Sequence, residues 1–67
     1  MSVAKVVEIT SESPSGFEAA VKEGLERASR TLENIQSAWI KEQQVVCERG
    51  KPARFRVDMK VTFVLND

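Results

Sequence analysis

The 67 residues of this chain include one cysteine and no histidine, which limits how the fold can be held together. So short a chain buries a small share of its surface, and proteins of this size usually add disulfides, a metal or partner subunits. Cys47 has no second cysteine for an intrachain disulfide, and thiolate or imidazole ligands for a zinc site are lacking. We therefore expect one domain, residues 1–67, that is stabilised by self-assembly.

Charge and hydropathy indicate which partners the chain lacks. Ten basic and ten acidic residues balance, whereas a general nucleic-acid or membrane-surface binder needs a net basic face. No apolar run approaches the ~20 residues of a membrane span, and residues 1–5 do not resemble a secretion signal. With a free cysteine as well, the sequence predicts a cytoplasmic protein that binds neither nucleic acid nor membrane.

The first half of the chain predicts a strand followed by a helix. Residues 3–10 are mostly β-branched and alternate in polarity, which favours a strand. Ser13 suits a helix N-cap and Pro14 the first helical position, so a helix is predicted from there to about Leu32. The small Gly24 would let this helix lie close to a sheet. Its apolar stripe consists of Phe17, Val21, Leu25, Ala28 and Leu32.

The second half predicts a long antiparallel hairpin. Strands at 35–48 and 53–65 flank the turn 49–52, where Gly50 can adopt a positive φ. The last strand alternates most regularly. Its apolar side chains are Phe55, Val57, Met59, Val61, Phe63 and Leu65, and its polar ones are Arg54, Arg56, Asp58, Lys60 and Thr62.

Alternation also predicts which side chains of the preceding strand lie together. One face is expected to hold Ser37, Trp39, Lys41, Gln43, Val45 and Cys47. If the hairpin pairs symmetrically about its turn, Trp39 lies opposite Lys60 and Gln43 opposite Arg56. The predicted class is α+β: a β-α-β-β chain whose three-stranded antiparallel sheet packs on one helix. Its open sheet edges need covering by other subunits.

The order and spacing of several segments over nearly the whole chain resemble the dodecin family. These segments are Val6–Ile9, Ser13–Ala20, Arg27–Ala28, Thr31–Leu32 and Phe55–Phe63. The resemblance implies a hollow homododecamer built from trimers. It also implies a non-catalytic storage role, in which flavin (riboflavin or its phosphate, FMN) stacks between tryptophans of neighbouring subunits.

The resemblance also suggests where a flavin would be held, with two positions changed. In flavin-binding members the stacking Trp stands where this chain has Ser37, and Trp39 occupies the place of a Glu. Arg56 replaces a Gln that contacts the flavin. A shifted Trp39 can still stack on a planar ligand. The candidate flavin-binding residues are Trp39, Arg56, Ser37, Gln43 and Lys60.

Two of these candidates have alternative roles. Trp39 can instead fill a subunit interface or cap the sheet, and Arg56 can form a cross-strand or intersubunit ion pair. The alternative function is a dodecin-like shell without flavin, either structural or binding a cation or another small anionic ligand. Carboxylates that could surround a hard cation on a symmetry axis are Glu8, Glu42, Glu48 and Asp58.

Catalysis has little support in the sequence. There is no His base, no Tyr and no glycine-rich phosphate loop, and Cys47 has no partner base. We therefore expect a binding protein rather than an enzyme, with an incidental thiol at Cys47.

The first prediction concerns assembly. Size-exclusion chromatography with light scattering should give one discrete oligomer, with twelve subunits expected, because the core of one copy is too small. Cys47→Ser should assemble equally well. A stable folded monomer at micromolar concentration would contradict this prediction.

Overall fold

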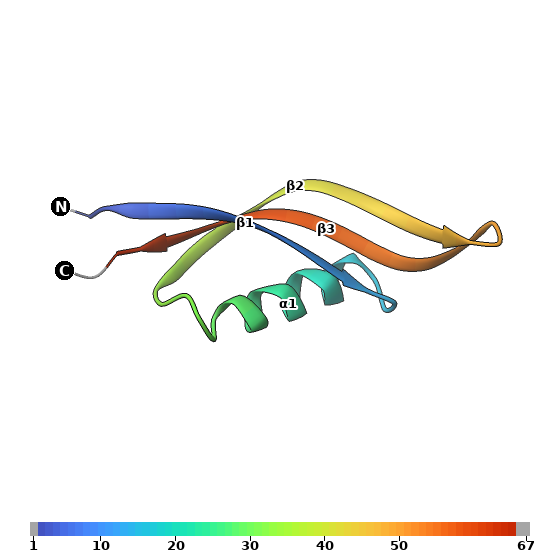
Figure 1. The fold of residues 1–67 in the computed structure, drawn as a ribbon, viewed down its shortest axis with the longest axis horizontal. Helices are drawn as coiled ribbons and strands as arrows, with labels where there is room; N and C mark the ends of the chain where they lie inside the picture. Colours follow the sequence, from blue (N-terminus) through green and yellow to red (C-terminus); the bar gives the residue numbers. More distant parts are fainter. Residues whose placement is uncertain (1, 66–67) are drawn as a thin grey trace.

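The computed structural model describes residues 2–65 and contains four elements. They are β1 (Ala4–Ser13), α1 (Phe17–Ala28), β2 (Ile35–Glu48) and β3 (Lys51–Val64). The sheet has the order β1-β3-β2 and both pairs are antiparallel, so the last strand is the central one. The helix lies along one face of this sheet (Figure 1). The predicted α+β class and β-α-β-β order are confirmed.

The β2–β3 hairpin makes the molecule long and thin. β1 pairs with β3 only from Phe55 to Val64, so the end of the hairpin extends past both β1 and α1 (Figure 1). The principal extents are 51 × 19 × 13 Å and the radius of gyration is 13.7 Å. A compact domain of this length would have a radius of gyration of about 11 Å. One copy therefore lacks the shape of a self-sufficient globule.

The core lies between α1 and the middle of β3. Val57, Met59 and Val61 are completely buried because the central strand has a neighbour on each side and the helix over one face. Ala20 of α1 is also completely buried against them. The side chains partly buried around this centre are Val7, Ile9, Phe17, Val21, Leu25, Leu32, Ile35 and Ala38.

Gly24 allows α1 to approach the sheet closely. A Cβ atom placed on Gly24 would lie 2.8 Å from Cβ of Ser11 and 2.9 Å from Cε of Met59. Both separations are shorter than a normal van der Waals contact, and Ser11 is held in place by its strand. The role predicted for this glycine is confirmed.

The helix begins later than predicted. Ser13 is the last residue of β1 rather than the N-cap, and its buried hydroxyl accepts the N–H of Ser15 at 3.1 Å. That bond closes a Ser-Pro-Ser turn of the kind these residues favour. Gly16 then precedes the helix with φ 140°, a conformation that L side chains rarely adopt. Strand pairing up to Phe55 extends β1 beyond its predicted end at Thr10.

The helix also ends earlier than predicted, at Ala28. The N–H groups of Arg30 and Thr31 bond to carbonyls three residues back, at 3.2 and 3.1 Å, so the chain leaves the α-helix in tight turns. Leu32 nevertheless packs on the core, as its place in the apolar stripe predicted. No helix within residues 2–65 is long and apolar enough to span a membrane.

The hairpin turn is shorter than predicted. Glu48 and Lys51 are paired, which leaves Arg49 and Gly50 as a two-residue turn with φ of 53° and 76°. Positive φ at both positions is typical of the type I′ turn, whose twist matches that of a hairpin. β3 accordingly starts at Lys51, two residues earlier than expected.

A large apolar surface remains outside this small core. One copy exposes 5080 Å², whereas a compact monomer of 7.5 kDa exposes about 4,200 Å². The helix packs on β1 and β3, so much of β2 has no helix over it. The large apolar side chains left exposed are Val3, Val6, Trp39, Ile40, Val45 and Leu65.

The second prediction tests the close approach at Gly24. Gly24→Ala should lower the free energy of unfolding by about 1–3 kcal/mol, because the new methyl group overpacks the helix–sheet contact. In an open helix the same change would stabilise by about 1 kcal/mol. Chemical denaturation measures the difference, and adding Ser11→Gly should recover part of the loss. An alanine variant as stable as the wild type would contradict the prediction.

Candidate ligand-binding face

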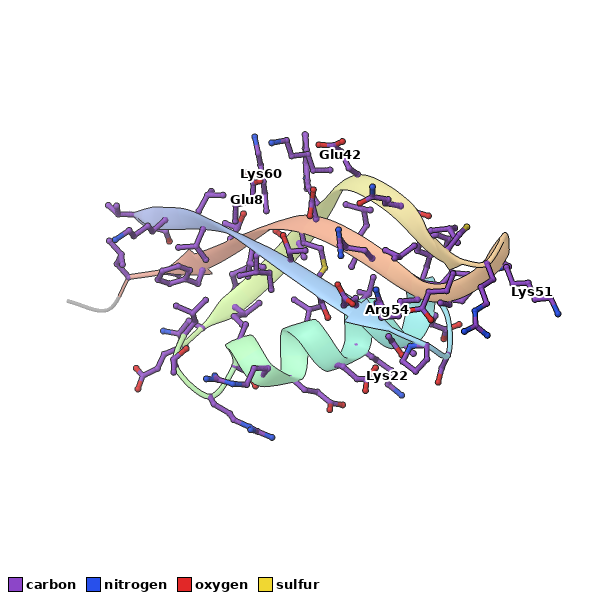
Figure 2. The ribbon with its side chains drawn as sticks, turned by 45° about the vertical axis from the view of Figure 1, so that its right-hand side comes forward. Glu8, Lys22, Glu42, Lys51, Arg54 and Lys60 are labelled. Carbon is purple, nitrogen blue, oxygen red and sulfur yellow. The ribbon has the colours of Figure 1, made fainter. Side chains whose placement is uncertain are left out.

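The sheet face away from α1 carries polar side chains in rows that cross all three strands. Because Val57, Met59 and Val61 point toward the helix, the alternate residues of β3 point the other way. Lys60 lies between Glu8 of β1 and Trp39 of β2. Figure 2 shows Glu8, Lys60 and Glu42 together on the side opposite α1. The rows of this face, which we call the polar face, are Val6–Thr62–Ser37, Glu8–Lys60–Trp39, Thr10–Asp58–Glu42 and Glu12–Arg56–Gln44.

Trp39 is the most exposed large apolar side chain of residues 2–65. It is 76% exposed and pairs with Lys60, so this predicted pairing is confirmed. Ser37 precedes it on the same face, opposite Thr62. An indole in this position presents a flat aromatic surface beside a hydroxyl and an ammonium group.

A β-bulge at Lys41 changes the faces of β2. Ile40 pairs with Met59, but the next pair joins Glu42 to Asp58, so one extra residue lies between them. From Glu42 to Val46, the even-numbered residues lie on the polar face, which exchanges the predicted faces of this segment.

The bulge makes one predicted pairing wrong. Gln43 lies opposite the buried Val57, and Gln44 takes its place opposite Arg56. A second irregularity, between Val46 and Cys47, restores the symmetric spacing at the turn. The two shifts are opposite in sign, so the residues before Lys41 return to the symmetric register. The pairing of Trp39 was therefore predicted correctly.

Lys41 uses its place in the bulge to reach across the sheet. Its Nζ donates to both carboxylate oxygens of Glu8, at 3.3 and 3.4 Å. Glu8 pairs with Lys60 in the strand register, yet its carboxylate is bound by Lys41. The side chain of Lys60 has no ion pair or hydrogen bond among residues 2–65. The unengaged cation of the polar face therefore lies directly opposite Trp39.

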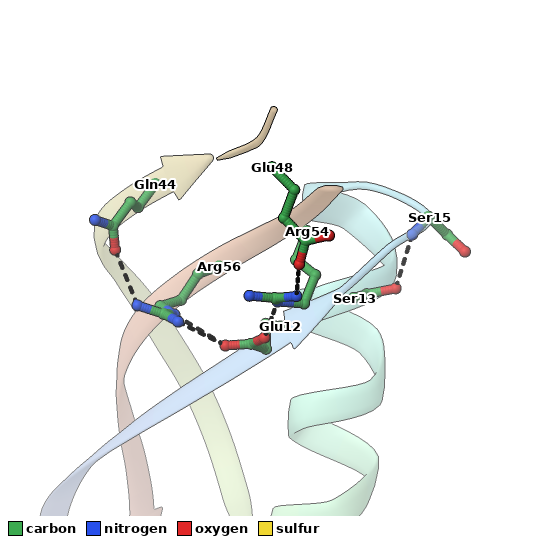
Figure 3. A network of polar contacts seen from close by, with 7 residues as sticks. All are labelled: Glu12, Ser13, Ser15, Gln44, Glu48, Arg54 and Arg56. Carbon is green, nitrogen blue, oxygen red and sulfur yellow. Dashed lines mark hydrogen bonds and ion pairs between the residues drawn. The ribbon is translucent and has the colours of Figure 1, made fainter. Parts of the chain in front are cut away.

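Arg56 is held by neighbouring strands on both sides (Figure 3). Its Nε and Nη2 lie 3.0 and 2.9 Å from Oε1 of Glu12, and Nη1 donates to Gln44 at 3.3 Å. Glu12 also pairs with Arg54 at 2.8 Å, and Arg54 with Glu48 at 3.0 Å. The cross-strand ion pair considered for Arg56 is thus formed, and its guanidinium has few donors left for a ligand.

The row between Lys60 and Arg56 is acidic. Glu42 and Asp58 lie opposite each other, and like charges in that position repel. The carboxylate of Asp58 accepts the Thr10 hydroxyl at 2.8 Å, whereas the carboxylate of Glu42 has no hydrogen bond or ion pair within residues 2–65. A shallow hollow of about 260 Å³ lies beside the pair, lined by Glu42, Gln43, Gln44, Arg56 and Asp58.

The remaining carboxylates proposed for a cation are already paired. Lys41 binds Glu8 and Arg54 binds Glu48. Within residues 2–65 no three acidic or cysteine side chains converge as metal ligands. One copy therefore supplies at most two neighbouring carboxylates, those of Glu42 and Asp58, to a hard cation.

The chemistry of the polar face fits a flat aromatic ligand with polar substituents. The exposed indole suits stacking, and the hydroxyl of Ser37 and ammonium of Lys60 suit oxygen atoms. Sequence reasoning missed the roles of Lys41 and Gln44. The sequence held one signal: Ile40 and Val45 are both apolar but are five residues apart, an odd number that places them on opposite faces of a regular strand. The structure has both on the helix side, because the bulge lies between them.

Comparison with known proteins gives one consistent family. The model of the family described as Dodecin matches residues 3–66. The calcium dodecin of Mycobacterium tuberculosis is 32% identical over 63 residues, which are 94% of this chain and 89% of that protein.

Solved structures agree with that match. The dodecin from Streptomyces davaonensis has a TM-score of 0.95 and 33% identity, with 98% of this chain and 97% of that chain covered. The crystal structure of the M. tuberculosis calcium dodecin, described as having a novel calcium-binding site, has a TM-score of 0.84 and 28% identity, with 96% and 91% covered. The family match, the identities and the shared β-α-β-β fold show that this chain belongs to the dodecin family.

Proposed function

We propose that this chain assembles in the cytoplasm into a hollow homododecamer of trimers that binds and stores flavin, riboflavin or FMN, without catalysing a reaction. The observation that carries the proposal is Trp39, an indole 76% exposed on a polar sheet face. An exposed Trp among charged side chains leaves a large apolar area in water. Covering it with a flat ring system removes that cost.

The residues around Trp39 give the proposed site its polar contacts. Lys60 stands directly opposite and Ser37 two residues before on the same face. Arg56 and Gln43 contribute less, because Arg56 is bound by Glu12 and Gln44, and Gln43 is paired with a buried residue. The site as proposed therefore rests on Trp39, Lys60 and Ser37.

The open surface of one copy supports the proposed assembly. Its 5080 Å² exceeds the area of a compact monomer by several hundred Å², and burial of apolar area is the main driving force of association. Ile40 and Val45 lie on the helix side of the sheet, but on β2, which α1 does not cover, and they are 42% and 41% exposed. Subunit contacts over this strip would complete the small core.

A second candidate function is binding of a cation such as Ca²⁺. It is favoured by Glu42 and Asp58, two carboxylate residues paired in the strand register, and by the likeness to a protein named calcium dodecin. Calcium takes six to eight oxygen ligands. Two carboxylates are too few, so such a site needs oxygens from neighbouring copies or water.

The third prediction tests flavin binding through Trp39. Riboflavin added to the assembled protein should lose fluorescence, because stacking on the indole quenches the flavin. Trp39→Ala should weaken binding by about 1–3 kcal/mol, by analogy with base–aromatic stacking. Trp39→Phe keeps a smaller ring and should retain part of the affinity. Unchanged riboflavin fluorescence in a large excess of wild-type protein would exclude this function.

The fourth prediction tests the cation. If Ca²⁺ binds, calorimetry on the assembled protein should detect it, and Glu42→Gln with Asp58→Asn should abolish it by removing both charges. The amide introduced by Asp58→Asn keeps an oxygen that can accept the Thr10 hydroxyl. Glu18→Gln, in the first turn of α1 and away from the polar face, is the matched control and should bind Ca²⁺ normally. If the protein binds calcium but does not quench flavin fluorescence, cation binding replaces flavin storage as the function of this shell.

A further inference from the structure

We propose that Lys60 is the cationic contact of the ligand stacked on Trp39, and that it makes the site prefer flavins carrying a phosphate over uncharged ones. This inference rests on the proposed flavin-binding function. It assigns to Lys60 the role that a charged, planar guanidinium at Arg56 would otherwise be expected to fill.

Lys60 is available because a second lysine has taken its natural partner. Glu8 is its register neighbour on β1, at a distance where oppositely charged side chains normally pair. Both oxygens of Glu8 are instead within 3.4 Å of Lys41 Nζ. Lys41 reaches Glu8 from the bulge of β2, so the bulge leaves Lys60 without an anion among residues 2–65.

Arg56 is poorly placed to bind a phosphate because its guanidinium is already paired. Its Nε, Nη1 and Nη2 all lie within 3.3 Å of Glu12 or Gln44 oxygens. A phosphate there would have to displace Glu12, which also holds Arg54. Breaking these ion pairs would weaken phosphate binding at Arg56. A phosphate that contacts Lys60 breaks no ion pair within residues 2–65.

Position along β3 also favours Lys60. Directly opposite residues of antiparallel strands have Cβ atoms about 5 Å apart, so Lys60 reaches the surroundings of the Trp39 indole. Arg56 is four residues further along, or about 13 Å at the rise of a strand. The acidic row of Asp58 and Glu42 lies between them and repels a phosphate directed toward Arg56.

The experiment compares FMN with riboflavin by fluorescence quenching of the assembled protein. Wild type should bind FMN about twofold to fivefold more tightly, the range expected for one exposed ion pair. Raising the salt concentration should reduce this ratio. Lys60→Gln should bring the ratio to about one, because it should weaken FMN binding more than riboflavin binding. Lys51→Gln, next to the hairpin turn, removes the same charge and should keep the wild-type ratio.

A second variant tests why Lys60 is free. Lys41→Gln leaves Lys60 in place but releases Glu8 to pair with it, so the preference for FMN should fall here too. Three results would overturn the inference while the proposed function stands: equal affinity of wild type for both flavins, a preference that survives Lys60→Gln, or one lost only in Arg56→Gln. If neither flavin is quenched, the proposed function and this inference both fail.

Discussion

Packing of the central strand against the helix is the interaction on which the rest of the molecule depends. β3 has a neighbour on each side, and its inward side chains Val57, Met59 and Val61 meet α1 without solvent. The same alternation sends Arg56, Asp58 and Lys60 to the opposite face. One strand thereby creates the core on one side of the sheet and the charged rows on the other.

That core is narrow, and its size explains the shape of the whole. The helix has twelve residues that rise about 1.5 Å each, whereas each hairpin strand has fourteen that rise about 3.3 Å each, so the hairpin extends past the covered region. Gly24 brings the helix close to Ser11 and Met59, and the contact is dense but short. The remaining apolar surface on β2 has no cover within one copy. Stability and assembly are therefore expected to be linked.

The pairing of charges on the polar face depends on the extra residue at Lys41 of β2. The bulge at Lys41 sends this lysine to Glu8 and moves Gln44 to Arg56. Within residues 2–65, each charge on the face then has a partner or a repelling neighbour, except Lys60 beside Trp39. A β-bulge often re-aims side chains, and here it separates the cations that form ion pairs from Lys60, which forms none within residues 2–65.

The sequence by itself determined the fold class, the order of elements and the two faces of β3. Apolar and polar residues alternate along β3 with the two-residue period of a strand, so only one face of the strand can be buried. The symmetric hairpin predicted from the sequence also gave the pairing of Trp39 with Lys60, because the two register shifts between Trp39 and the turn cancel. Only the tertiary structure decided the helix bounds and the partners of Gln43 and Arg56. Those depend on where strand pairing stops and where a bulge falls, and both are settled by packing between segments far apart in the chain.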